Sequence, residues 1–76
     1  MQEQYIMLKD INSIREFVKE VISINYDVDL VQGRYIVDAK SIMGIFALDI
    51  ASPIKLVAHS DNAGDFFAKI ERFIVK

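Results

Sequence analysis

The chain has no cysteine, so neither a disulfide framework nor a thiolate metal site is available to it. One proline and three glycines among 76 residues leave no room for a linker or a low-complexity tract. No apolar run approaches the roughly 18 residues that span a bilayer. The N-terminus, Met1 to Gln4, also lacks the basic region of a signal peptide. We therefore expect a cytoplasmic domain that has no membrane segment.

An excess of basic residues is missing as well. The formal charge is −2, and the nine lysines and arginines are scattered singly along the chain. Binding of nucleic acid needs a concentrated basic surface, so we expect no nucleic-acid partner. A single histidine among scattered acids is weak support for a metal site, and we predict neither a metal nor another cofactor.

What the chain does contain is enough apolar material for one core. Hydrophobic residues make up 53% of the sequence, and its length fits one small domain, residues 1–76. Alternation of apolar and polar residues predicts four strands. These strands cover residues 4–9, 26–31, 34–39 and 54–59, with a turn at Gln32-Gly33 between the second and the third.

Apolar residues at helical spacing predict three helices. Ser13 and Glu16 fit a capping box at the start of the first, with Asn12 as a further cap. Its predicted buried stripe is Ile14, Phe17, Val18, Val21 and Ile22. The second helix runs from Ser41 through about Ile50, and the third is capped by Asn62 with Asp65, assisted by Asp61.

The resulting order is βαββαβα, which predicts an α+β domain in which one layer of helices covers a four-stranded, mainly antiparallel sheet. The other face of the sheet stays open to solvent. Its expected residues are Tyr5, Met7, Val57 and either Tyr35 or Val37. Ordinary surface hydrophobicity, a partner surface and a homodimer are three interpretations of this face that the sequence leaves open.

The segment Lys40-Ser41-Ile42-Met43-Gly44 resembles the regulatory-serine segment of HPr, the small phosphocarrier of the bacterial sugar phosphotransferase system. The element order matches that of HPr from Tyr5 to Val75. The resemblance implies an open-faced β-sandwich with strand order 1-4-2-3 and three helices on one face. It also implies a bacterial source.

The resemblance implies a regulatory role for Ser41. In the family this serine is phosphorylated by an HPr kinase/phosphorylase, and the phosphorylated protein then binds a catabolite-control regulator. Lys40 is placed to pair with the phosphate, and Ile42, Met43 and Phe46 correspond to the patch that contacts enzyme I and other partners. The plain structural interpretation is that Ser41 only caps its helix, since serine is among the best capping residues.

The phosphotransfer site of the family is missing from the expected place. Asn12 falls at the position of the phosphoacceptor histidine, and Ile14 falls at the position of the neighbouring arginine. An amide nitrogen is not a nucleophile at neutral pH. His59, the only histidine, is expected on the outward face of the fourth strand, with no evident carboxylate-and-nucleophile partner set, as a bystander.

The sequence therefore predicts a non-enzymatic, HPr-like regulatory or adaptor domain that binds proteins through the Ser41 helix. Two alternatives remain. One is an active phosphocarrier in phosphoenolpyruvate-dependent sugar uptake. The other is a structural interaction module in which Ser41 is only a cap.

Overall fold

The computed structural model describes residues 1–75. Within this range the elements follow the predicted βαββαβα order, and a short 3-10 helix comes after the last α-helix. The elements are β1 (Gln2–Ile6), α1 (Ile11–Ile22), β2 (Val28–Gln32), β3 (Tyr35–Asp38), α2 (Ile42–Ile45), β4 (Ile54–Ala58), α3 (Gly64–Lys69) and η1 (Glu71–Phe73). None of the described helices has the length and apolar character needed to cross a membrane.

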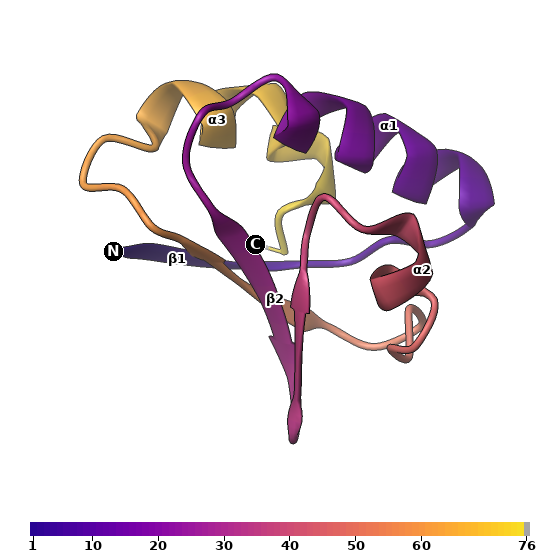
Figure 1. The fold of residues 1–76 in the computed structure, drawn as a ribbon. Coiled ribbons are helices and arrows are strands. Elements are labelled where there is room, and N and C mark those ends of the chain that lie inside the picture. Colours follow the sequence, from indigo (N-terminus) through magenta and orange to yellow (C-terminus); the bar gives the residue numbers. More distant parts are fainter. Residues whose placement is uncertain (76) are drawn as a thin grey trace.

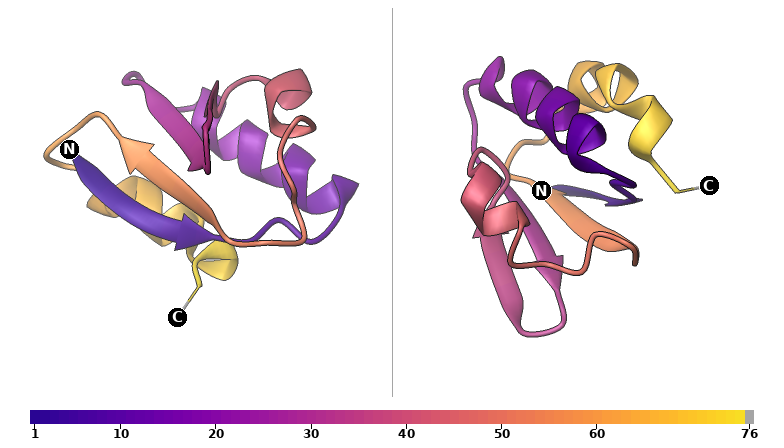
Figure 2. Two further views of the ribbon diagram at one scale, coloured as in Figure 1. Left: turned by 90° about the horizontal axis from the view of Figure 1, so that it is seen from below. Right: turned by 90° about the vertical axis from the view of Figure 1, so that its right-hand side faces the viewer.

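The strands form one antiparallel sheet in the order β1-β4-β2-β3, as predicted. Helices α1 and α3 lie side by side above one face of this sheet, and α2 lies at one end, next to β3 (Figure 1). The two further views show that no helix covers the other face (Figure 2). The molecule is thus the expected α+β sandwich of one sheet and one layer of helices.

The core fills the space between the sheet and the helices. The inward residues of β4 are Ile54, Leu56 and Ala58, and all three are fully buried, as the alternation predicted. Helix α1 contributes Ile14, Phe17, Val18 and Val21. The prediction that Ile22 belongs to this stripe is wrong, because its side chain is 62% exposed. Ile22 is the last residue of the helix, and its direction around the helix axis differs by about a quarter of a turn from the centre of the buried stripe.

Helix α1 begins earlier than predicted because Asp10 caps it. Asp10 has an extended backbone, and its carboxylate accepts a hydrogen bond of 2.8 Å from the backbone N–H of Ser13. Aspartate caps as well as serine does. Ser13 and Asn12 are therefore residues of the first turn, and the predicted capping by these two residues is wrong.

A two-residue turn, Gly33-Arg34, joins β2 to β3. It pairs Gln32 with Tyr35 and lies one residue later than the predicted turn. Gly33 has a φ of 58°, a conformation that side-chain-bearing residues rarely adopt. Glycine at the first central position is typical of tight hairpin turns whose twist matches that of the strands.

Helix α2 ends at Ile45 instead of near Ile50. The segment after it is held by the side chain of Gln32, at the end of β2. Its Oε1 accepts from the backbone N–H of Asp49 at 2.7 Å, and its Nε2 donates to the carbonyl of the same residue at 2.9 Å. These two bonds tie the chain to the sheet, so it leaves the helical path early.

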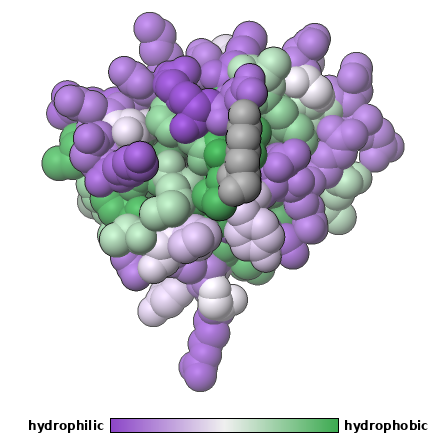
Figure 3. All heavy atoms as spheres, turned by 180° about the vertical axis from the view of Figure 1, so that it is seen from behind, coloured by the Kyte–Doolittle hydropathy of each residue, from purple (hydrophilic) through white to green (hydrophobic). Residues whose placement is uncertain are grey.

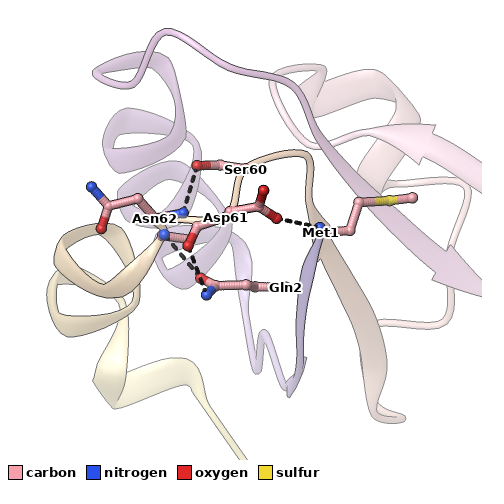
Figure 4. A network of polar contacts seen from close by, with 6 residues as sticks. Met1, Gln2, Ser60, Asp61 and Asn62 are labelled. Atoms are coloured by element: carbon pink, nitrogen blue, oxygen red, sulfur yellow. Dashed lines mark hydrogen bonds and ion pairs between the residues drawn. The ribbon is translucent and has the colours of Figure 1, made fainter.

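The start of α3 is held from a distant part of the chain (Figure 4). The side chain of Gln2 accepts from the backbone N–H of Ala63 at 2.9 Å, and it donates to the carbonyl of Asp61 at 3.2 Å. The Asp61 carboxylate pairs with the amino group of Met1 at 3.0 Å. The prediction that Asn62 caps this helix is wrong, since the cap residue is Ala63 and no side chain of the segment bonds there.

The C-terminal segment covers the outer edge of β1. Ile74 pairs with Ile6 in an antiparallel bridge. The N–H of Val75 donates to the carbonyl of Tyr5 at 2.8 Å, and the N–H of Met7 donates to the carbonyl of Phe73 at 2.9 Å. These pairings close one edge of the sheet with the chain itself.

The view from behind shows hydrophobic side chains in the middle of the surface, with hydrophilic ones around most of the rim (Figure 3).

Candidate functional site

The Ser41 hydroxyl caps α2. Its Oγ accepts a hydrogen bond of 3.1 Å from the backbone N–H of Gly44, and the Ser41 carbonyl accepts from Ile45 at 3.1 Å. The Ser41 N–H donates to the carbonyl of Asp38 at 3.0 Å, which fixes the approach from β3. The side chain is partly buried. Ser41 is therefore held in place by its backbone, while its hydroxyl oxygen is engaged in one neutral hydrogen bond.

Gly44 lets α2 approach β3 closely. A Cβ atom at this position would lie 3.2 Å from the Cβ of Val37 and 3.4 Å from the Oγ of Ser41. Both distances are at or below the short end of van der Waals contact. The glycine of the Lys40–Gly44 segment therefore positions the serine hydroxyl as well as the helix.

Three apolar side chains of this segment are exposed, as predicted. Ile42 is 36% exposed, Met43 79% and Phe46 48%. On the opposite side of the helix, Ile45 is fully buried, and Leu48 is buried just beyond it. We refer to Ile42, Met43 and Phe46 as the α2 patch. The short helix has one inward side, which leaves these three side chains facing solvent.

Lys40 precedes the cap residue. Its backbone N–H donates to the Asp38 carboxylate at 2.9 Å, so the loop from β3 into α2 is fixed by Asp38 through two consecutive N–H groups. Among residues 1–75, the Lys40 ammonium makes no ion pair with a carboxylate. Its side chain is partly buried, and its charge is available beside Ser41.

Asn12 lies in the first turn of α1 with its side chain exposed, and the start of α1 is at the same end of the molecule as α2 (Figure 1). Ile14, where the family places an arginine, is fully buried. The backbone N–H of Ser13 already donates to the Asp10 carboxylate, and this hydrogen bond holds the pKa of the Asp10 carboxyl below its ordinary value. A negative charge of the chain itself thus stands at the helix start where an incoming phosphate would bind.

His59 has a carboxylate partner that was not evident from the sequence. Its Nε2 lies 2.8 Å from Oδ2 of Asp29, and its backbone N–H donates to the carbonyl of Asp27. The pair sits at the end of β4, where this strand runs alongside β2. Within the described part of the chain, no group of three or more acidic or histidine side chains could hold a metal ion.

The open face of the sheet consists of two cross-strand rows. In each row, the pairing of β1 with β4, of β4 with β2 and of β2 with β3 brings four residues into line. The first row is Glu3, Val57, Asp29 and Asp38, and the second is Tyr5, Lys55, Val31 and Ile36. Lys55 also forms an ion pair of 3.4 Å with Glu3. Charged and apolar residues are therefore mixed across this face, with Asp29 next to Asp38 in the first row and Val31 next to Ile36 in the second.

Two of the predicted members of this face are misplaced. Val37 pairs with Leu30 on the helix side of the sheet, and Tyr35 pairs with Gln32 on that same side. Ile36 takes their place on the open face and is 68% exposed. Met7 lies beyond the end of β1 and lines a hollow of about 170 Å³ with residues of α1 and η1.

The sequence-based prediction missed Ile36, Asp10 and the Asp29 partner of His59. The sequence signal that could have placed Ile36 is the turn Gln32-Gly33-Arg34. If the turn is moved by one residue, the side chains of the following strand exchange faces. Asp10, two residues before Asn12, is an ordinary capping residue and was detectable. Nothing in the local sequence pairs Asp29 with His59, since they are 30 positions apart.

Comparison with known proteins finds similarity among solved structures. No family model and no curated protein matches this chain. Among solved structures, it is similar to "HPr-C-His" from Thermoanaerobacter tengcongensis, with a TM-score of 0.80 and 24% sequence identity, over 95% of this chain and 89% of that one. The chain therefore has an HPr-like fold.

Proposed function

We propose that this chain is an HPr-like adaptor domain, related to the bacterial sugar phosphotransferase system, which binds another protein through the α2 patch. The two-sided character of α2 carries the proposal. Ile45 anchors the helix in the core, whereas Met43 and Phe46 face solvent. Exposed methionine and aromatic side chains in one cluster are typical of docking surfaces, because they bury much apolar area on contact.

The sequence around the patch indicates the class of partner. Lys40 to Gly44 resembles the HPr regulatory segment, and the similar solved structure from Thermoanaerobacter tengcongensis carries HPr in its name. We therefore propose as partner a component of the phosphotransferase system such as enzyme I, an HPr kinase/phosphorylase, or a catabolite-control regulator.

We further propose that the chain is not an enzyme and does not carry phosphate on histidine. Asn12 offers no nucleophile at the start of α1, and the Asp10 carboxylate already accepts from that turn. His59 follows the end of β4 and is bonded to Asp29, and this end of β4 lies away from α2 (Figure 1). A phosphocarrier that used His59 would need its partner to bind a different surface from the α2 patch.

Ser41 is the proposed site of regulatory phosphorylation. Its phosphate would add nearly two negative charges beside Lys40, whose ammonium makes no ion pair with any carboxylate of residues 1–75. The cap-only interpretation also has a supporting observation, which is the hydrogen bond from the Gly44 N–H to Ser41 Oγ. Both interpretations are compatible with docking through the α2 patch.

Docking is tested by titrating the labelled protein with enzyme I and mapping backbone chemical-shift changes. We expect changes at Ile42, Met43 and Phe46. Met43→Ser should weaken binding by about tenfold, since loss of a buried apolar contact costs on the order of 1–2 kcal/mol. Ile22→Ser is the matched control, because Ile22 is an exposed apolar residue on another helix. Equal losses in the two variants would argue against the α2 patch.

Phosphorylation is tested by intact mass in two reactions. With ATP and HPr kinase, we expect one added phosphoryl group in the wild type and none in Ser41→Ala; no addition to the wild type would leave Ser41 as a cap only. With phosphoenolpyruvate and enzyme I, we expect no acid-labile phosphate. Its appearance, and its loss in His59→Ala, would establish the phosphocarrier alternative.

A further inference from the structure

The two edges of the sheet differ in how they are protected. The outer edge of β1 is paired with residues 73–75 of the same chain. The outer edge of β3 is paired with no strand of residues 1–75. The turn end of the hairpin that carries β3 projects away from the helices (Figures 1 and 2), whereas Val37 of β3 lies against α2. An uncovered strand edge presents free N–H and C=O groups that can pair with another chain.

The backbone groups at this edge can be assigned from the hydrogen bonds to β2. The N–H of Ala39 donates to the carbonyl of Val28, so Ala39 faces β2. Alternate residues of an antiparallel strand point their N–H and C=O groups the same way. Tyr35 and Val37 therefore also face β2, and both the N–H and the C=O of Ile36 point outward from the sheet.

The side chains at this edge are apolar and exposed. Ile36 is 68% exposed on the open face, and Tyr35 is 60% exposed on the helix side. Edge strands are commonly protected by lysine, proline or a bulge. The sequence of β3, Tyr35 to Asp38, contains neither lysine nor proline, and its pairing with β2 is continuous. What protects this edge is the shortness of the strand, four residues, and its last residue Asp38, whose side chain is charged and whose carbonyl already accepts from the N–H of Ser41.

We propose that β3 pairs antiparallel with β3 of a second copy of this chain, centred on Ile36, and so joins two sheets into one. Two-fold pairing centred on Ile36 places the two copies of this residue opposite each other, and their outward N–H and C=O groups form two reciprocal hydrogen bonds. This inference is independent of docking through the α2 patch.

Charge complementarity selects this register. Pairing centred on Ile36 sets Arg34 of each copy opposite Asp38 of the other, which brings opposite charges together twice. Pairing centred on Val37 would instead set Ile36 opposite Asp38. A slip by a single position between partners would place open-face residues against helix-side residues, which direct pairing does not allow. The symmetric match of Arg34 with Asp38 is the reason to choose a second copy as the occupant.

The absence of native cysteine makes the geometry directly testable. The Ile36→Cys variant of the full chain should form a disulfide-linked dimer under mild oxidation, since paired positions of neighbouring strands lie within the Cα separation that a disulfide spans. Ile22→Cys is the control, because Ile22 is 62% exposed, close to the 68% of Ile36. Cross-linking of Ile22→Cys at the same rate would overturn the proposal.

Sedimentation equilibrium over a concentration series tests the unmodified protein. We expect a monomer–dimer equilibrium that Ile36→Lys weakens by at least about tenfold, because two lysines would then meet at the centre of the pairing. Met43→Ser should leave the equilibrium unchanged, and circular dichroism verifies that each variant is folded. A wild type that stays monomeric up to millimolar concentration contradicts the proposal, even if β3 accepts a strand from a different protein.

Discussion

Helices α1 and α2 start with the same hydrogen bond made by different chemistry. At α1, the Asp10 carboxylate accepts from the N–H of Ser13 at 2.8 Å; at α2, the Ser41 hydroxyl accepts from the N–H of Gly44 at 3.1 Å. The first start already carries a negative charge, and the second is neutral. At α1 the Asp10 carboxylate already makes the favourable interaction between an anion and a helix start, whereas at α2 the capping group carries no charge that could make it.

The residues around the two helix starts also differ. Asn12 is a polar, non-nucleophilic side chain in the first turn of α1. Ser41 is followed by the exposed side chains of the α2 patch and preceded by Lys40. The start of α2 is therefore the proposed place for a charge-adding modification, whereas at α1 the capping position is already taken by the Asp10 carboxylate.

The largest expected effect comes from Gly44→Val. A branched side chain at this position would collide with Val37 and displace the Ser41 hydroxyl, since even a Cβ would lie 3.2 Å from Val37. We expect a loss of about 1–3 kcal/mol in the free energy of unfolding, measured by urea denaturation. Gly64→Val is the matched control, because no atom lies within 4 Å of a Cβ there. Similar losses in both variants would show that the close approach of α2 to β3 is not the cause.

Ser41→Ala should cost about 1 kcal/mol of stability, because the N–H of Gly44 loses its acceptor. Ser41→Asp should retain the stability of the wild type, since a carboxylate also caps a helix start and adds the charge that α2 lacks. Thermal unfolding of the three proteins checks this order. If Ser41→Asp unfolds as easily as Ser41→Ala, the two helix starts are not equivalent capping sites.

The smallest effect is a dependence on pH that belongs to α1 alone. The hydrogen bond from Ser13 lowers the pKa of Asp10 in the folded protein, so the carboxylate stabilises the fold above its unfolded-state pKa. That contribution disappears as the pH falls from about 4 through the lower folded-state pKa. Asp10→Asn keeps a capping side chain without the charge. Its stability should therefore approach that of the wild type as the pH is lowered, and Ser41→Ala should show no such convergence.

The order of elements and the inward residues of the strands were predictable from the sequence. Successive side chains of a strand point to opposite faces of the sheet, so the positions of the apolar residues show which side faces the core. Val28, Leu30 and the alternate residues of β4 are buried as this pattern predicts. The exposure of the α2 patch followed from the same local logic, since a short helix has one inward side. The fold as a whole agrees with the HPr-like prediction.

Features that depend on distant residues were predicted wrongly or missed. The end of α2 is decided by Gln32, 17 positions before Asp49, and the start of α3 is held by Gln2, 61 positions before Ala63. No local pattern contains these contacts. The face of β3 was inverted for a smaller reason, because a shift of the turn by one residue exchanges Ile36 with its neighbours.

The sequence by itself determined the α+β architecture, the burial pattern of the strands and the capping serine of the Lys40–Gly44 segment. These depend on residue spacing and on capping chemistry, which act over one or two turns of chain. Only the tertiary structure decided that His59 pairs with Asp29, that Gly44 sits against Val37 and that β3 is the uncovered edge of the sheet. Each of these needs two segments far apart in sequence to be brought together, and the packing of the core is what brings them together.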